Sequence, residues 1–370
     1  MPDVVALALP GGTAWVDELR RAWDGGDAVA PVDLRLPPDA RDDQMAALAP
    51  TMIVDRSGRR RLKDGQPSAP GDALVITSSG TSGRARAAVL THESLLAAAT
   101  ATSAVLHVDP GADRWLACLP LAHVGGFGVV SRALLTATPL EVHDGFDTAA
   151  VSAAAGEGVS LVSLVPAMLE RIRAASFRHI LLGGSAIPPD RPANSVATYG
   201  MTETGGGVVY DGRPLANVEC RVIDGEIQLR CPMLLREYRD GTDPRQDDGW
   251  YPTGDGGTFE NGLVRVDGRL DDAIVTGGEK VWPELVERVL EAQPGVRGAA
   301  VVGRPDPTWG QAVTAIIEPE DPGAPPALDA LRDAVKETLP GWYAPKSIEF
   351  VAQVPRTALG KISRVELRGP

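Results

Sequence analysis

The amino-acid sequence predicts an α/β protein with a large N-terminal α/β domain containing mixed sheets and a small α+β C-terminal domain. From Asp72 onward, short β-branched runs alternate with helical stretches, which is typical of largely parallel strands connected by helices. After about residue 215 the pattern changes to strands joined by tight turns, and near Arg269 a smaller unit with amphipathic helices begins. We therefore expect domains at residues 1–268 and 269–370.

The elements expected in the N-terminal domain follow this alternation. Residues 1–70 are rich in Pro, Asp and Arg and have only short apolar segments, so we expect a shortened, partly irregular cap there. Thr91 can cap a helix that runs to about Leu106, and Pro166 suits the first position of another helix. The expected strands are 73–77, 115–119, 159–164, 180–182 and 196–198.

The C-terminal third of the chain predicts hairpins and two amphipathic helices. The Asp224-Gly225 pair is a strong signal for a tight turn between two antiparallel strands. Apolar residues spaced three and four apart indicate helices with one buried face. The expected elements are strands 222–223, 226–230, 263–266, 298–303 and 312–317, and helices 283–292 and 327–339.

Composition argues against several classes of function. The net charge is −13 without a basic block, so we expect neither nucleic acid nor an anionic membrane as a partner. The sequence has no apolar run long enough for a transmembrane helix, and Asp3 stands where a signal peptide needs a basic residue, which predicts a cytoplasmic protein. Cys118, Cys220 and Cys231 lack metal-ligand spacing and are expected to be reduced thiols.

The stretch VITSSGTSGRARAAV (75–89) runs from a strand-like segment into a loop of Ser, Thr and Gly. Exposed N–H groups in such a loop form an anion-binding concavity, and Gly80 and Gly83 let the backbone approach a ligand. The loop does not fit the pattern G-x-x-x-x-G-K-[ST], so an ordinary P-loop NTPase is not predicted. Taken alone, the loop is equally compatible with a plain surface linker.

Two further segments carry residues suited to a nucleotide. In YGMTETGGG (199–207), Tyr199 can stack on a purine, Thr202 can bind a phosphate, and Glu203 can hold Mg²⁺ through a hard oxygen contact. The alternative for this segment is a Gly-rich turn with an N-capping Thr. In GWYPTGDGG (249–257), Asp255 lies in a Gly-flanked turn suited to accepting bonds from a ribose diol.

Together these segments resemble the acyl-adenylate-forming enzymes, which include acyl- and aryl-CoA synthetases, luciferases and peptide-synthetase adenylation domains. The resemblance covers about residues 72–364 and rests on six motifs in the family's order: SSGTSGRARAAVLTH, LPLAHVGG, YGMTETGG, GWYPTGD, GRLDDAIVTGGEKVWPELVE and PRTALGKISR. Within the family, the short N-terminal region and the stretches LPLAHVGGF and HILLGGSAIPP look most like o-succinylbenzoate–CoA ligases of menaquinone biosynthesis.

The resemblance implies the acyl-adenylate-forming fold and a two-step acid–CoA ligation that uses ATP, Mg²⁺ and coenzyme A. Lys361 is implied as the catalytic lysine that bridges the substrate carboxylate and the α-phosphate or ribose, with Glu203 as the Mg²⁺ carboxylate. The residues implied to bind ATP are Ser79, Gly80, Thr81, Ser82, Gly83, Arg86, Gly183, Gly184, Ser185, Tyr199, Gly200, Met201, Thr202, Asp255 and Arg269.

The resemblance also implies an acyl site and a moving C-terminal domain. His123 is implied to gate the acyl pocket, although a lone His is more often a satisfied core residue. The small domain is implied to rotate at a hinge near Asp271 between the two steps, which withdraws Lys361. The acyl site is implied to contain His123, Gly125, Gly126 and Gly205, and the CoA or thioester step to use Gly277, Gly278, Glu279, Lys280 and Trp282. Glu279 and Lys280 are otherwise a solvated turn.

The sequence departs from the family at two places. Most relatives read T-G-x-P-K-G in the loop, whereas here Ala85 replaces the proline and Arg86 the lysine. Arginine still supplies positive charge and can grip a phosphate with two bonds. The region before the loop is also short, so acyl-pocket walls are expected from a partner subunit. A homodimer is one way to supply them.

Alternatives to the o-succinylbenzoate reading stay open at this point. One is a CoA ligase for another aryl or short-chain acid, and another is a stand-alone adenylation enzyme that loads a carrier protein. A non-enzymatic alternative is a degenerate relative that binds nucleotide without turnover. The sequence names no residue that would bind a second substrate carboxylate.

Overall fold

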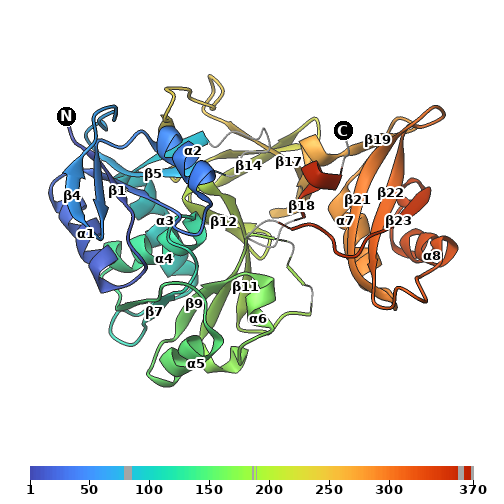
Figure 1. Cartoon of the computed structure of the whole chain (residues 1–370), viewed down its shortest axis with the longest axis horizontal. Helices are drawn as coiled ribbons and strands as arrows, with labels where there is room; N and C mark the ends of the chain where they lie inside the picture. The colour runs from blue at the N-terminus through green and yellow to red at the C-terminus, as the bar shows by residue number, and fades with distance from the viewer. Residues whose placement is uncertain (79–85, 186, 189, 357–361, 368–370) are drawn as a thin grey trace. The chain divides into compact units, whose positions relative to one another are not determined.

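A computed structural model describes residues 1–78, 86–185, 187–188, 190–356 and 362–367 (Figure 1). The chain forms two compact units. The first comprises residues 1–220, 229–251 and 262–264, and the second comprises 221–228, 252–261 and 265–370. The domain boundary at residue 268 and the hinge near Asp271 stay predictions.

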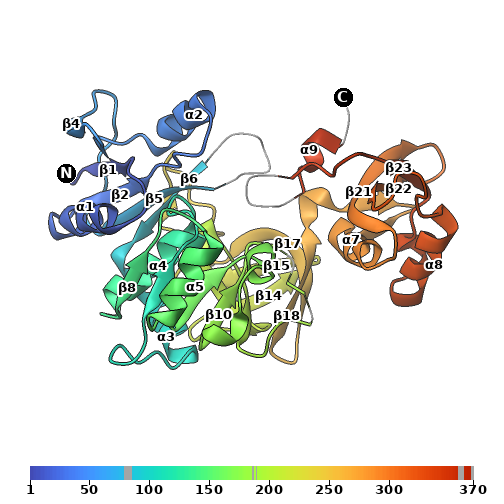
Figure 2. The same cartoon turned by 60° about the horizontal axis from the view of Figure 1, so that its bottom comes forward.

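The first unit begins with a seven-stranded mixed sheet of order β16-β6-β5-β2-β1-β3-β4. Strand β1 pairs in parallel with β2 and β3, and β2 pairs in parallel with β5, while β6 is antiparallel to β5 and to β16. Helix α1 contacts β1 and β2, and Figure 2 shows it beside them. The bounds are β1 Val4–Leu7, α1 Thr13–Asp24, β2 Ala28–Pro31, α2 Pro38–Leu48, β3 Met52–Asp55, β4 Gly58–Arg61, β5 Asp72–Ser78, β6 Arg86–Thr91 and β16 Glu237–Tyr238.

Residues 1–70 are partly irregular, as expected, but they form part of a sheet layer and not a cap. This region supplies four strands and two helices of the sheet layer. Strands β1 and β2 have only four residues each, and every one is buried, so each resembles an incidental apolar segment in the sequence. Polar segments separate these short strands and hide the regular βαβ order in the sequence.

A second seven-stranded sheet has the order β13-β12-β11-β10-β9-β7-β8. Helix α3 contacts β5 and β6 of the first sheet and β12 of the second, so it lies between the two sheets, and α4 packs beside it against β7, β9 and β12. Thr91 caps α3 as predicted, since its side chain accepts a bond from the Ser94 backbone N–H at 3.1 Å. The bounds are α3 His92–Val105, β7 Trp115–Ala117, α4 Val124–Leu135, β8 Leu140–Val142, α5 Thr148–Gly156, β9 Leu161–Leu164, α6 Pro166–Leu169, η1 Ala174–Ser176, β10 His179–Leu182, β11 Ser195–Met201, η2 Thr202–Thr204, β12 Gly206–Tyr210 and β13 Arg213–Pro214.

A four-stranded sheet of order β14-β15-β17-β18 follows. The predicted tight turn is confirmed, because Asp224 and Gly225 both have positive φ angles of 51° and 83°, as a type I′ turn requires. The bounds are β14 Glu219–Ile223, β15 Glu226–Arg230, β17 Tyr251–Glu260 and β18 Leu263–Arg269.

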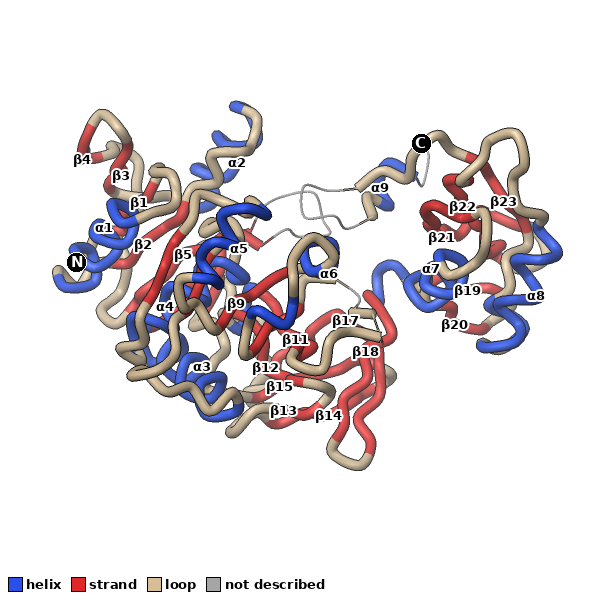
Figure 3. Tube along the Cα trace, turned by 90° about the horizontal axis from the view of Figure 1, so that it is seen from below, coloured by secondary structure: helices blue, strands red, loops and turns tan. Residues whose placement is uncertain are grey.

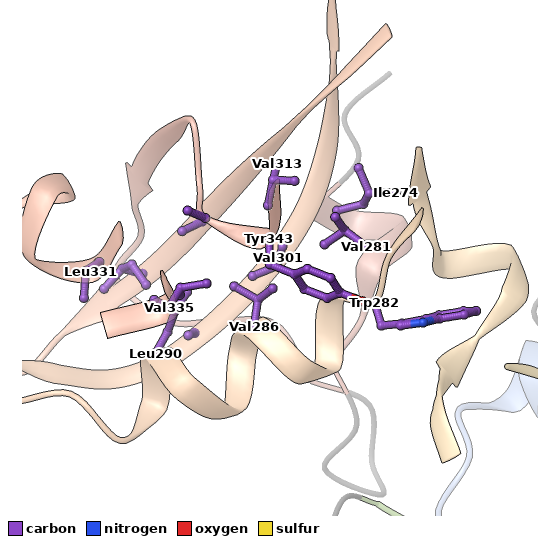
Figure 4. Packing of buried hydrophobic residues seen from close by; sticks show 14 of the residues in the cluster. Ile274, Val281, Trp282, Val286, Leu290, Val301, Val313, Leu331, Val335 and Tyr343 are labelled. Carbon is purple, nitrogen blue, oxygen red and sulfur yellow. The ribbon is translucent and has the colours of Figure 1, made fainter. Parts of the chain in front are cut away.

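The remaining part of the second unit is a five-stranded sheet with two amphipathic helices. Its order is β20-β19-β22-β21, with β23 pairing in parallel with β22. Helix α7 packs on β21 and on α8, an arrangement visible in Figure 3. Val286 and Leu290 of α7 meet Leu331 and Val335 of α8 in one buried cluster (Figure 4). The bounds are η3 Leu270–Asp272, β19 Ile274–Thr276, β20 Glu279–Val281, α7 Pro283–Glu291, β21 Val296–Asp306, β22 Gly310–Pro319, α8 Leu328–Thr338, η4 Gly341–Tyr343, β23 Ser347–Phe350 and α9 Arg364–Leu367.

The predicted fold class is thus confirmed, with a large α/β part and a smaller α+β part. Across the described residues, the structure contains no helix with the length and apolar character needed to cross a bilayer.

Candidate functional site

A buried carboxylate, Glu203, lies at the end of β11 in the short helix η2. The side chain is 8% exposed, and its Oε1 accepts a hydrogen bond of 2.9 Å from the Tyr238 hydroxyl. The main chain is held as well, because the Leu235 N–H donates to the Glu203 carbonyl at 2.7 Å. Gly205, with φ of 65°, ends η2 in the left-handed region and turns the chain into β12.

Glu203 offers a hard carboxylate oxygen of the kind that Mg²⁺ takes as a ligand. Among the described residues, no three His, Cys, Asp or Glu side chains gather in a way that could form a complete protein cage. Mg²⁺ is usually bound through one or two carboxylates together with substrate phosphates and water. One fixed carboxylate at this position is therefore what a magnesium–nucleotide site needs from the protein.

Arg86, the departure from the family loop, lies against the same tyrosine. Its guanidinium carbon is 3.7 Å from the centroid of the Tyr238 ring, and its Nη2 is 3.3 Å from Asp240 Oδ2. Burial and the neighbouring Glu203 raise the pKa of Tyr238 to about 12, so the phenol is a proton donor at neutral pH. Sequence reasoning missed Tyr238, because its partners lie 35 residues or more away in the chain.

The residues predicted near the adenine are brought to one edge of the second sheet. Gly183, Gly184 and Ser185 follow β10, and Tyr199 lies near the end of β11, which pairs in parallel with β10. The carboxyl ends of parallel strands meet at one sheet edge, where α/β folds commonly bind ligands. Gly184 has φ of 83°, which favours glycine whatever ligand is present.

Gly200 has a structural reason to be glycine. A Cβ atom there would lie 2.0 Å from the Gly206 carbonyl oxygen of the neighbouring strand. The adjoining Met201 and Thr202 continue from β11 into η2 and so reach Glu203.

Asp255 and Arg269, both implied to bind ATP, are in contact within the second unit. Arg269 Nη1 is 3.0 Å from Asp255 Oδ1 and donates to the Thr253 carbonyl at 3.1 Å. Asp255 is 7% exposed, and its backbone N–H donates to Thr253 Oγ1. The carboxylate is thus fixed in one orientation, as recognition of a diol requires.

His123, the predicted gate of the acyl pocket, is the N-cap residue of α4. Its Nε2 lies 3.3 Å from Oδ2 of Asp33, which comes from the loop after β2. Asp33 is 6% exposed and is gripped by Arg35 through two bonds of 2.8 and 2.6 Å. Burial alone would raise the pKa of Asp33, but the hydrogen bonds from Arg35 and His123 outweigh it and hold this pKa well below its usual range.

The predicted acyl glycines surround the start of α4. A Cβ atom at Gly126 would lie 2.4 Å from the Pro120 carbonyl oxygen, so this glycine permits the tight turn into the helix. Gly205 adjoins Gly128 of α4, where a Cβ atom would lie 3.4 Å from the Gly205 carbonyl. The structure therefore brings Gly205 and α4 together, as the acyl-site prediction requires. Gly125 lies in the first turn of the same helix.

Arg132, also on α4, is a second residue that sequence reasoning missed. It is 8% exposed, and its Nε and Nη1 atoms are buried without a hydrogen-bond partner among the described residues. Its guanidinium lies over the Trp115 ring at 4.8 Å, and Nη2 is 4.0 Å from the position of a Cβ atom on Gly128. A buried cation without an anionic partner is costly for folding, so a bound anion is its natural complement.

The residues predicted for the thioester step form a hairpin in the second unit. Gly277 and Gly278 have φ angles of 60° and 88° and make the turn between β19 and β20. Glu279 and Lys280 are exposed after this turn. Trp282, in contrast, which is labelled in Figure 4, is 8% exposed. It packs on Gly256, where a Cβ atom would lie 2.1 Å from the indole ring.

Arg364 anchors the chain shortly after the predicted catalytic lysine. It donates to both carboxylate oxygens of Glu287 at 2.8 and 2.7 Å, and it lies 3.5 Å from Asp272, next to the predicted hinge residue Asp271. Glu287 is 4% exposed, and this burial raises its pKa to about 7 in spite of the arginine. Lys361 and the loop residues Ser79, Gly80, Thr81, Ser82 and Gly83 lie outside the described residues.

Comparison with known proteins shows the family of this chain. The pattern of the AMP-binding enzyme family matches residues 55–233, and that of the AMP-binding enzyme C-terminal domain matches residues 285–361. A probable 2-succinylbenzoate–CoA ligase of Mycobacterium tuberculosis is 38% identical over 322 residues, which cover 80% of this chain and 83% of that protein. The chain therefore belongs to the AMP-binding enzyme family.

Other relatives share nearly the whole chain. A feruloyl-CoA synthase of Amycolatopsis sp is 30% identical over an alignment that covers 99% of this chain and 88% of that protein. The structure of o-succinylbenzoate CoA synthetase from Bacillus subtilis in complex with the acyl-adenylate intermediate OSB-AMP has a TM-score of 0.87 and 24% identity, and covers 100% of this chain and 88% of that one. The same enzyme solved with ATP and magnesium ion has a TM-score of 0.85. At this identity the likeness concerns the fold.

Proposed function

We propose that this protein is an AMP-forming acid–CoA ligase that converts 2-succinylbenzoate and coenzyme A to 2-succinylbenzoyl-CoA. In the first step, a substrate carboxylate oxygen attacks the α-phosphorus of ATP, and the bond to pyrophosphate breaks. In the second, the CoA sulfur attacks the acyl carbonyl, its proton is lost, and AMP leaves. The relatives that carry this activity in their names are the first support for the assignment.

The observation that carries the substrate assignment is Arg132. 2-Succinylbenzoate has two carboxylates, of which one is activated and the other must be bound. Arg132 offers buried N–H donors, and its Nη2 lies near Gly128, the glycine of α4 that adjoins Gly205 of the proposed acyl site. A guanidinium binds a carboxylate with two parallel bonds, and burial strengthens that pairing.

The first step brings anions together, so the protein's work is positioning and charge stabilisation. Bound Mg²⁺ supplies charge neutralisation at the phosphates, and Glu203 is the residue that would hold it. Arg86 binds the outer phosphates in place of the usual lysine, and Asp255 accepts bonds from the ribose. Lys361 bridges the reacting carboxylate and the α-phosphate.

The second step requires the hairpin at Gly277 and Gly278 to replace Lys361 at the reacting carbonyl. We propose that the change occurs by rotation near Asp271 between domains 1–268 and 269–370. The anchor from Arg364 to Glu287 and Asp272 supports this, because it ties the chain after Lys361 to the hinge segment within one unit. Lys361 then moves with the small domain as one body.

A second candidate function is CoA ligation of another aryl acid. The feruloyl-CoA synthase that aligns with 99% of this chain favours it. Ferulate has a single carboxylate, so this alternative leaves Arg132 without an anionic partner. We further propose a cytoplasmic location, where ATP and CoA are available, and a homodimer that completes the acyl pocket.

The experiment that tests the function follows AMP and thioester by mass spectrometry after incubation with MgATP, CoA and a panel of acids. We expect 2-succinylbenzoyl-CoA from 2-succinylbenzoate and far less product from ferulate or benzoate. AMP or adenylate without thioester indicates a carrier-protein acceptor instead. ATP binding without turnover of any acid indicates a degenerate relative and refutes the proposal.

A further inference from the structure

Tyr238 contacts both Arg86 and Glu203. Its ring lies under the Arg86 guanidinium at 3.7 Å, and its hydroxyl donates to Glu203 Oε1 at 2.9 Å. At 6% exposure, the phenol has little access to water as an alternative partner. One buried side chain thus joins the proposed phosphate-binding arginine to the proposed metal-binding carboxylate.

The backbone around Tyr238 is tied to the same two segments. The Leu235 N–H donates to the Glu203 carbonyl at 2.7 Å, and the Arg239 N–H donates to the Ala87 carbonyl at 2.7 Å. Between these bonds, Tyr238 pairs with Ala88 of β6, two residues after Arg86. Strand β16 is therefore a short brace between β6 and η2, and Tyr238 is held in place on it.

We infer that Tyr238 is a positioning residue that sets Glu203 and Arg86 for binding of the metal–nucleotide complex, an inference that rests on the proposed function. The hydroxyl fixes the plane of the Glu203 carboxylate, so the carboxylate meets a cation in one orientation. The ring fixes the guanidinium plane of Arg86. A planar guanidinium can stack on an aromatic face, whereas the ammonium of lysine is a point charge on a flexible stem. The stack thus gives arginine a role that the common lysine does not fill.

Two substitutions distinguish the contribution of the Tyr238 hydroxyl from that of its ring. Tyr238→Phe keeps the stack and removes the bond to Glu203, and Tyr238→Leu removes both. The measurement is binding of Mn²⁺, by electron paramagnetic resonance, to protein with the non-reacting analogue α,β-methylene-ATP, together with affinity for the analogue without metal. We expect Tyr238→Phe to weaken Mn²⁺ binding about tenfold, the loss of one hydrogen bond to a charged group, and to leave metal-free affinity unchanged. Tyr238→Leu should also weaken metal-free affinity about threefold.

Tyr210→Phe is the matched control, because the Tyr210 hydroxyl is also buried and makes a bond of 2.9 Å to Thr102. This variant should leave Mn²⁺ affinity unchanged, and thermal unfolding of all variants checks that they are folded. The inference is overturned if Tyr238→Phe binds Mn²⁺ like the parent, if Tyr210→Phe shows the same loss, or if Phe and Leu at position 238 behave alike. Failure of the parent itself to bind the metal–nucleotide complex refutes the proposed function instead.

Discussion

Replacement of Arg132 by methionine should lower the activity on 2-succinylbenzoate without lowering the stability of the protein. The side chain is 8% exposed, and its Nε and Nη1 have no hydrogen-bond partner within the described part of the chain. Burial lowers the pKa of Arg132, which shows that the folded protein disfavours the charge it carries. Methionine has a similar length and fills the space with apolar atoms.

The loss of activity follows from the bonds that the proposed carboxylate would make. A hydrogen bond between charged groups contributes about 1.5–2 kcal/mol net at the lower end of its range, so two such bonds contribute about 3–4 kcal/mol. At 1.4 kcal/mol for each factor of ten, Arg132→Met should lower kcat/KM for 2-succinylbenzoate by about two to three orders of magnitude.

The change in stability should differ from that caused by the same substitution at Arg236, a comparable arginine that has an anionic partner. Arg236 donates to both oxygens of Asp72 at 2.9 and 3.0 Å, and the Asp72 side chain is 0% exposed. Arg236→Met leaves a buried carboxylate without its ion-pair partner and should destabilise the protein by about 3 kcal/mol. Arg132→Met removes an unmatched buried cation, so its Tm should equal or exceed that of the parent.

The assay compares thioester formation from 2-succinylbenzoate and from benzoylpropionate, which keeps the keto acid chain and lacks the ring carboxylate. The parent should prefer the first acid strongly, and Arg132→Met should lose that preference without slower turnover of the second. Equal losses on both acids, or a fall in Tm as large as that of Arg236→Met, would refute the assignment of Arg132 to a substrate carboxylate.

Two further predictions concern the pairs Asp33–His123 and Glu287–Arg364. Asp33→Asn should lower kcat/KM about tenfold through misorientation of His123, with a changed pH profile of kcat. Because the folded state lowers the pKa of Asp33, its stabilising contribution is present above the ordinary value of 3.8 and is lost as the pH falls below it, so parent and variant should converge in acid denaturation. Glu287 has the opposite sign: its pKa is raised from 4.5 to about 7, so its contribution is full below 4.5 and is lost as the pH rises through 7. The urea midpoint of the parent should fall across that window more than that of Glu287→Gln, and parallel curves would count against the buried pair.

The sequence predicted correctly those elements that depend on interactions between residues close together in the chain. The N-cap at Thr91 and the turn at Asp224-Gly225 depend on side chains within three residues, and both are confirmed. The order of the short strands in residues 1–70 was missed, since burial by distant strands rather than propensity decides them. Four buried residues such as Val4–Leu7 become a strand only because β2 and β3 lie beside them.

The residues of the candidate site also fall into those that the sequence predicted and those that only the fold revealed. Motifs identified Glu203, Asp255 and His123 as candidates, because each lies in a characteristic run of residues. The residues that orient them could not be read from those runs. The contact of Tyr238 with Glu203 spans 35 positions, and Asp33 and His123 come from different sheet layers. Such partners become visible only once the fold brings them together.

The arginine at position 86 illustrates why a departure from a motif is best interpreted with its surroundings. Within the loop, Arg86 looks like a weakened lysine or a product of the Arg-rich composition of this chain. In the fold, its guanidinium is stacked on Tyr238 and lies 3.3 Å from Asp240, 154 positions further along the chain. A lysine at this place would keep the charge but lose the planar stack on Tyr238, the residue that donates to Glu203. The substitution and the brace formed by β16 therefore belong to one arrangement, in which the phosphate-binding cation and the metal-binding carboxylate are set by the same tyrosine.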